Sequence, residues 1–277
     1  MSEIYADLHL HSDFSDGVVA PPELLVRAGY AGLSVVALTD HDTLDGVEPI
    51  LAAARDGGPE VVPGVELSCT EGEREIHILG YWIDPGHPGL CAELARMREK
   101  RVRRAETIID RLRTYQIDLR IEDVLSLTKN GLVGRPHIAD AMVRGGWAAD
   151  AESVYRKYIG DGKPAAVPKR FLTPPEGIRL IRDAGGISAV AHPGVSRLED
   201  LLPGLAGEGL VALEVWHPKH SSREVERFAA LADRIGLLPT GGSDYHGFDQ
   251  GATMLGHYGL TEERFARLGK AAGRRPG

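Results

Sequence analysis

Histidines and acidic residues recur in this chain at the ends of short apolar segments that read as strands. The set comprises His9 and His11, Asp40 and His41, His192, His217, and Asp244 with His246, and Glu66 and His77 close or interrupt two more such segments. Because side chains along a strand alternate between its two faces, His9 points the same way as His11. The same spacing relates Asp244 to His246. We therefore expect these side chains to gather at one edge of a sheet.

The residue types in this set define the chemistry that it can perform. Imidazole and carboxylate groups without thiolates are typical ligands of hydrolytic Mn, Fe or Zn sites, whereas sulfur-rich sites are more often structural zinc. One such histidine alone is more often an interior or surface side chain with its hydrogen bonds satisfied. Repetition at so many strand ends favours a shared cluster. The pattern predicts a catalytic metal centre.

Length, charge and cysteine content restrict the class of protein. A chain of 277 residues that is 43% hydrophobic suits one large domain or a barrel with an insertion. The net charge of −8 argues against a general nucleic-acid coat protein and against a partner such as a long duplex. With Cys69 and Cys91 as its two cysteines, the chain has no disulfide framework and fits a reducing compartment.

The N-terminal segment has neither a basic region nor an apolar region of the secretory type, and no run approaches the roughly 20 apolar residues of a spanning helix. We therefore expect a soluble, cytoplasmic protein with no membrane partner.

The elements that must position the ligand residues alternate between strands and helices. Apolar runs and helix-like stretches alternate over residues 4–85, with helices expected at 23–31 and 46–54, and again over residues 174–242. Alternating strands and helices indicate a parallel sheet or barrel. In such folds the chemistry lies at the carboxyl ends of the strands.

A stretch of about a hundred residues between the fourth and fifth predicted strands contains no convincing strand, which is far longer than an ordinary connection. Its apolar spacing predicts a long helix over residues 90–115 and shorter helices at 121–128, 136–144 and 151–159. We expect a helical insertion domain at residues 90–167, with the barrel formed by residues 1–89 and 168–277.

Taken together, the motifs resemble a known family. They are DLHLHS at residues 7–12, DG at 16–17, TDHD at 39–42, AHP at 191–193 and SDYH at 243–246. This combination resembles the polymerase and histidinol phosphatase (PHP) family, and specifically its stand-alone nucleotide phosphatase and nuclease branch. GRPH at residues 134–137 and the segment at 160–168 also look like the inserted domain of that branch.

The resemblance implies an α/β fold, a distorted seven-stranded (β/α) barrel of PHP type with three divalent metal ions at one mouth. Carried over by position, one ion would take His9, His11, Glu66 and Asp244, a second Glu66, His77 and His192, and a third Asp16, His41 and His246. Every expected ligand position is filled. Manganese is the first expectation for the ions, with iron or zinc as alternatives, because such ligand sets accept several divalent ions.

A cluster of this kind is suited to phosphoester hydrolysis. Divalent ions about 3.5 to 4 Å apart lower the pKa of a shared water and clamp the oxygens of a phosphate. The carboxylates of Asp16, Glu66 and Asp244 would offset the closely spaced cations. Asp40 would act as an orienting acid beside His41, or alternatively as the N-cap of a helix over residues 42–54.

Substrate contacts are expected from residues outside the ligand set. Arg135 precedes Pro136 at a helix start, a place that attracts anions, and is the first choice for a phosphate clamp. His137 could bind phosphate or cap the helix, and Lys169 could reach over the metals or stay solvated. His217 could donate a proton to the leaving group or be a structural residue at the mouth.

These expectations point to a metal-dependent phosphoesterase that removes the terminal phosphate of a nucleotide, with a nucleoside 3',5'-bisphosphate as the leading substrate. The first alternative is a 5'-3' exoribonuclease acting on short RNA. Histidinol phosphate phosphatase and a non-catalytic, metal-stabilised interaction module follow. The oligomeric state is left open by the sequence.

Overall fold

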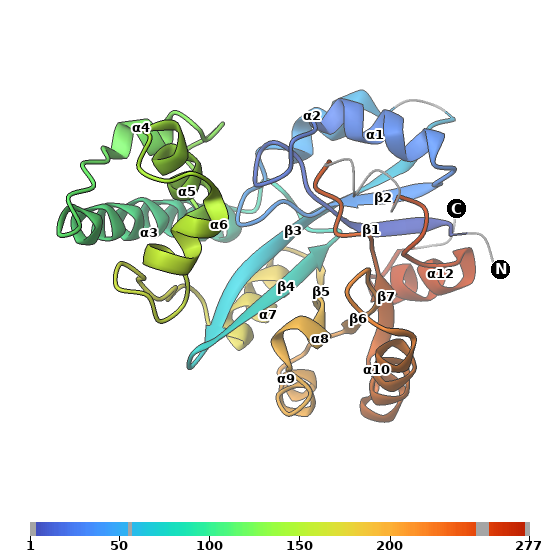
Figure 1. Cartoon of the computed structure of the whole chain (residues 1–277). Coiled ribbons are helices and arrows are strands. Elements are labelled where there is room, and N and C mark those ends of the chain that lie inside the picture. Colours follow the sequence, from blue (N-terminus) through green and yellow to red (C-terminus); the bar gives the residue numbers. More distant parts are fainter. Residues whose placement is uncertain (1–3, 55–56, 248–254, 275–277) are drawn as a thin grey trace. The chain divides into compact units, whose positions relative to one another are not determined.

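The computed structural model describes residues 4–54, 57–247 and 255–274 (Figure 1). The chain divides into two compact units, Met1–Cys91 with Leu172–Gly277, and Ala92–Phe171. The first unit holds all the strands and the second is helical.

One sheet of seven strands organises the first unit. The strands follow one another in sheet order as β1 Ala6–Leu10, β2 Val35–Leu38, β3 Glu60–Glu71, β4 Arg74–Tyr81, β5 Ile187–Val190, β6 Ala212–Trp216 and β7 Leu238–Gly241. Neighbouring strands are parallel except at β3–β4 and β4–β5, which are antiparallel. The expected seven-stranded α/β fold is confirmed.

The two ends of the sheet approach each other and nearly close it into a barrel. Strand β1 packs beside β7, and the N–H of His11 donates to the carbonyl of Tyr245 at 2.9 Å. A Cβ atom at Gly242 would lie 2.4 Å from Cβ of His9, so this approach requires glycine. Closure therefore brings the residues that follow β7 next to β1.

Seven helices of this unit are α1 Pro21–Tyr30, α2 Val47–Ala53, α7 Pro174–Asp183, α8 Pro193–Ser196, α9 Leu202–Gly207, α10 Ser222–Ile235 and α12 Glu262–Ala271. Apolar faces hold them to the sheet: Leu24 and Ile50 from α1 and α2 are buried with Val36 and Leu38 of β2. Capping boxes begin α7, at Thr173 and Glu176, and α10. Helices thus pack against the sheet through their apolar faces.

Helix α2 begins next to the expected residue 46 and not at residue 42. Gly46 is its N-cap residue, whereas the alternative role for Asp40 required a helix from residue 42. Residues 42–46 are not helical, and Asp42 has a left-handed backbone with φ 49°. The capping alternative for Asp40 is therefore wrong.

The second unit contains most of α3 Pro88–Arg113, together with α4 Ile121–Leu125, α5 Arg135–Arg144, α6 Ala151–Val154 and a π-helical turn, η1, at Tyr155–Ile159. The helices of this unit share a hydrophobic core, in which Ile108 and Leu112 of α3 pack with Val124, Met142 and Ile159. We propose that this unit is the insertion domain expected at residues 90–167. Among the described residues, no helix combines the length and apolar character needed to cross a membrane.

Candidate metal centre

The ends of the barrel strands carry the ligand residues that the sequence suggested. His9 lies in β1 and His11 directly follows it. His217 directly follows β6, and His192 lies two residues after the end of β5. Glu66 and His77 come from the β3–β4 hairpin. Because Glu66 pairs with Leu79 and Ser68 pairs with His77, the two ligand residues are diagonal neighbours on one face.

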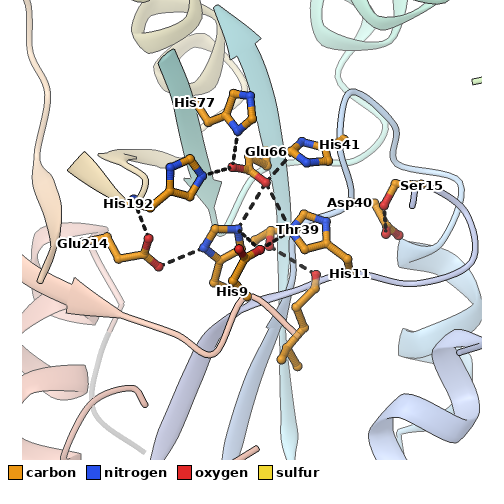
Figure 2. A network of polar contacts seen from close by, with 12 residues as sticks. His9, His11, Ser15, Thr39, Asp40, His41, Glu66, His77, His192 and Glu214 are labelled. Atoms are coloured by element: carbon orange, nitrogen blue, oxygen red, sulfur yellow. Dashed lines mark hydrogen bonds and ion pairs between the residues drawn. The ribbon is translucent and has the colours of Figure 1, made fainter. Parts of the chain in front are cut away.

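The carboxylate of Glu66 lies at the centre of five imidazole rings (Figure 2). Its Oε2 atom is 3.1 Å from His9 Nε2, 3.1 Å from His11 Nε2 and 3.2 Å from His41 Nδ1, and its Oε1 atom is 2.8 Å from His77 Nδ1 and 3.2 Å from His192 Nε2. The side chain of Glu66 is almost completely buried. The residues proposed for the first two ions therefore converge on one carboxylate.

Asp244 adds a second carboxylate beside this centre. Its Oδ1 atom lies 3.5 Å from His9 Nε2 and 3.3 Å from His11 Nε2. The backbone of Asp244 is left-handed, with φ 51°, an unfavourable conformation for a residue with a side chain. Strain of this kind is typical of functional sites, where the surrounding contacts hold it.

Asp16 collects the third group. Its Oδ1 atom is 3.2 Å from His246 Nε2 and 3.7 Å from His11 Nδ1, and its Oδ2 atom is 3.7 Å from His41 Nε2. One potential ligand atom from each of these four residues lies within 4.8 Å of all the others. His11 and His41 each lie near both Asp16 and Glu66. The resemblance placed each of these histidines in one ligand set only.

The geometry and the donor set fit divalent cations. Among the described residues, both ring nitrogens of His11, Nδ1 of His41 and Nδ1 of His192 are buried without a hydrogen-bond partner. Buried polar atoms are normally satisfied, and a carboxylate offers about four lone-pair sites, too few for five rings that all donate. Cations between the carboxylates and the imidazole lone pairs would satisfy both kinds of group.

The carboxylates and imidazoles of the cluster shift one another's pKa values. Burial would raise the pKa of Glu66, but the surrounding imidazoles, His41 first, hold it well below its usual range. Burial opposes protonation of His11, yet the neighbouring carboxylates of Asp244 and Glu66 outweigh it and raise the pKa of His11 to about 10. Glu66 likewise overcomes burial and raises the pKa of His77 to about 9. Protons on these rings therefore balance the carboxylates where cations would otherwise do so.

Asp40 acts on the loop that leads to Asp16. Its carboxylate accepts hydrogen bonds from the N–H of Ser12 at 2.6 Å and from the hydroxyl of Ser12 at 2.6 Å. It also accepts the hydroxyl of Ser15 at 2.7 Å (Figure 2). These bonds fix the turn between His11 and Asp16. Asp40 thus orients the segment that carries a proposed ligand, rather than the ring of its neighbour His41.

Two buried acids that the sequence reasoning missed lie behind the histidines. Glu214 Oε1 is 2.9 Å from His9 Nδ1, and its Oε2 accepts the N–H of His192 at 2.6 Å. Asp7 accepts the N–H of Ser243 at 2.9 Å, and burial raises the pKa of Asp7 to about 7. The available signal was an acid inside an otherwise apolar strand, since a buried charge requires partners.

His217 is completely buried next to Asp244. The backbone N–H of Lys219 donates to its Nδ1 atom at 3.1 Å, so the ring proton is on Nε2, which lies 3.3 Å from Asp244 Oδ2. Lys219, a cation not singled out from the sequence, places its ammonium group 3.7 Å from the same oxygen. The role of His217 as a proton donor remains a proposal.

The expected substrate contacts Arg135, His137 and Lys169 all belong to the Ala92–Phe171 unit. Arg135 begins α5, and its Nη1 atom is 2.6 Å from Asp161 Oδ1. His137 Nδ1 accepts the N–H of Gly134 at 3.1 Å, the capping contact that was its alternative role. Lys169 is half-buried in the segment after η1. Their contacts with substrate remain proposals.

Comparison with known proteins identifies relatives of this chain. The PHP domain model matches residues 7–130. A 3',5'-nucleoside bisphosphate phosphatase from Chromobacterium violaceum is 35% identical over 257 residues, which span 91% of this chain and 90% of the relative. The 5'-3' exoribonuclease Rnm of Escherichia coli is 36% identical over 247 residues, with 87% and 84% covered.

A solved structure extends the similarity to the fold. The crystal structure of a candidate metal-dependent phosphoesterase from Bifidobacterium adolescentis superposes with a TM-score of 0.85 at 30% identity, covering 98% of this chain and 97% of the other. The similarity is nearly full length in both directions. The chain therefore belongs to the PHP domain family and is a metal-dependent hydrolase of phosphoric esters.

Proposed function

We propose that this protein removes the terminal phosphate of a nucleoside 3',5'-bisphosphate. The observation that carries the proposal is the convergence of five imidazoles on Glu66, flanked by Asp244 and Asp16, in a chain that resembles a bisphosphate phosphatase over 91% of its length. The fit of nitrogen and oxygen donors favours three divalent ions, with manganese first.

Bound divalent ions at such a site lower the pKa of a shared water and neutralise the oxygens of the phosphate. The residues that would hold them form three groups: His9, His11, Glu66 and Asp244; Glu66, His77 and His192; and Asp16, His41 and His246. Glu66 would serve two groups, because its two oxygens face different histidines. His41 and His11 lie close enough to more than one group to serve in either.

Residues outside the three groups handle the substrate and its protons. We assign to His217 the protonation of the departing oxygen, because its Nε2 atom lies at the edge of the cluster beside Asp244. Arg135 would bind phosphate through its guanidinium, with His137 and Lys169 as further contacts. Asp40 would keep the turn before Asp16 in place.

The direct experiment measures release of inorganic phosphate from adenosine 3',5'-bisphosphate with added Mn²⁺. Replacement Asp244→Ala should abolish release and leave the circular dichroism spectrum near that of the wild type, because the side chain lies at the strand end and outside the apolar core. Glu208→Gln, an exposed change before β6, is the control. Turnover retained in Asp244→Ala would refute the proposed site.

The second candidate is 5'-3' exoribonuclease activity on short RNA, favoured by the 36% identity to the Escherichia coli exoribonuclease. The same groups would attack a phosphodiester, with a nucleotide as leaving group. Mononucleotide products from a labelled oligoribonucleotide, without phosphate release from the bisphosphate, would select this function. Phosphate release from histidinol phosphate, without release from the bisphosphate, would select the third candidate, a histidinol phosphate phosphatase.

A further inference from the structure

Glu214 is a charged residue in the middle of the apolar strand β6, where Leu213 and Val215 flank it. Its side chain is completely buried. Burial of a carboxylate is unfavourable unless hydrogen bonds replace its water. Both oxygens have such a partner, and each partner belongs to a different proposed metal ligand, His9 or His192.

The first contact sets the tautomer of His9. An ionised carboxylate only accepts hydrogen bonds, so Nδ1 of His9, 2.9 Å from Oε1 of Glu214, carries the proton. Nε2 is then the ring nitrogen that is left to bind a cation. That atom lies 3.1 Å from Glu66 Oε2 and 3.5 Å from Asp244 Oδ1, so it faces the centre of the cluster.

The second contact holds the backbone of His192. This residue has φ 28° and ψ 57°, a conformation that L-residues rarely adopt, at the point where β5 turns into α8. The N–H of His192 donates to Oε2 of Glu214 at 2.6 Å. In this conformation the ring Nε2 lies 3.2 Å from Glu66 Oε1.

We propose that Glu214 is a positioning residue of the metal centre. One carboxylate holds His9 in the tautomer that can ligate and His192 in the backbone conformation that aims its ring. Glu214 thereby links β6 both to the residues at the end of β5, its neighbour in the sheet, and to β1, which begins the strand order. The inference rests on the metal centre of the proposed function, and it does not depend on the identity of the substrate.

A rival role for Glu214 is direct ligation, because one potential ligand atom from each of Glu214, His9 and His217 lies within 4.8 Å of the others. The two roles differ in one proton. A positioning role keeps a proton on Nδ1 of His9 in the loaded protein, whereas ligation at Nδ1 removes it.

The test variant is Glu214→Gln, which preserves shape and supplies one acceptor in place of two. His192 N–H and His9 Nδ1–H then compete for a single oxygen. If the amide NH₂ group faces His9, the ring proton moves to Nε2 and the ligating lone pair is lost. Affinity for at least one ion is expected to fall about 10- to 100-fold, as for other groups that orient metal ligands.

Three measurements decide the matter: ions per chain after Mn²⁺ repletion and gel filtration, Mn²⁺ affinity by calorimetry, and the tautomer of His9 from ¹⁵N NMR of the metal-free and Zn²⁺-loaded protein. Glu208→Gln is the matched control and should behave as the wild type. Wild-type affinity and an unchanged tautomer in Glu214→Gln would overturn the proposal. So would a His9 Nδ1 without a proton in the Zn²⁺-loaded wild type.

Failure of the proposed function gives a different result. A wild-type protein that binds its ions but releases no phosphate from the bisphosphate would refute the substrate and leave the role of Glu214 intact. If Glu214→Gln does not fold, Glu214→Asp provides the second variant. Its shorter side chain retains the charge and both acceptors but cannot reach both partners, so lower ion affinity supports the proposal and wild-type affinity overturns it.

Discussion

Nε2 of His217 lies 3.3 Å from Oδ2 of Asp244, while Oδ1 of the same carboxylate faces His9 and His11. Asp244 thus contacts His217 through one oxygen and the two histidines through the other. Nε2 of His217 therefore lies beside the proposed metal ligands His9, His11 and Asp244. This arrangement suits a residue that protonates a leaving group.

Replacement of His217 by Gln should therefore lower kcat for the bisphosphate by about 10²- to 10⁴-fold, the usual contribution of a general acid. The loss should be much smaller with p-nitrophenyl phosphate, whose leaving group needs no proton. Steady-state kinetics on both substrates provides the comparison. His257→Gln, an exposed change, is the control. Equal losses on the two substrates would contradict the assignment.

The three ligand groups predict graded loss of metal. Asp16→Asn changes one group and should remove about one ion per chain, whereas Glu66→Gln should remove more than one, because five histidines face this carboxylate. Elemental analysis after Mn²⁺ repletion measures both. Equal metal content in the two variants would show that Glu66 does not bridge.

The pKa shifts predict how the metal-free protein responds to pH. The folded pKa values of His11 and His77, about 10 and about 9, exceed the ordinary histidine pKa of 6.5. Their contribution to stability is therefore complete below about pH 6.5 and is lost as the pH rises through 9 and 10. Chelator-treated protein should show a Tm that falls over this range, and His77→Gln should reduce the slope.

Metal binding should release protons, because the raised pKa values of His11 and His77 keep these rings protonated near neutral pH. Histidine must be neutral to ligate, and His11 and His77 are protonated at pH 7 in the metal-free fold. Calorimetry at pH 7 in buffers of different ionisation enthalpy gives the number of protons released per ion. No release would show that these rings do not ligate.

Closure of the barrel at Gly242 predicts a steric effect. A Cβ atom there would lie 2.4 Å from Cβ and 2.5 Å from N of His9. Gly242→Ala should push β1 from β7, lower the free energy of unfolding by about 1–3 kcal/mol and weaken metal binding. Gly204→Ala in α9, where nothing lies within 4 Å of the new Cβ, should be neutral or slightly stabilising. Urea denaturation compares them.

Arg135 can be tested separately from the metals. Arg135→Ala should raise KM for the bisphosphate by about 10-fold or more, because a charge-assisted contact to phosphate is lost, and should leave the number of bound ions unchanged. Arg144→Ala, an exposed change at the other end of α5, is the control. An unchanged KM would remove Arg135 from the phosphate site.

Much of the site could be predicted from the sequence, since it depends on local periodicity. The two-residue spacing of His9 and His11 places both rings on one face of β1, and both approach the same oxygen of Glu66. The alternation of strands and helices likewise predicted the α/β sheet. These features follow from side-chain direction and polarity, which neighbouring residues determine.

Tertiary structure decided which groups meet. Glu214 occurs in an ordinary apolar strand, and its function appears only when β6 lies between β5 and β7 and its carboxylate reaches His9 and His192. The sequence around Asp40 fits either of its expected roles. Asp40 binds Ser12 and Ser15 because β2 pairs in parallel with β1, which makes the segments after the two strands neighbours. Hydrogen bonds between residues far apart in sequence depend on barrel closure, which local patterns do not encode.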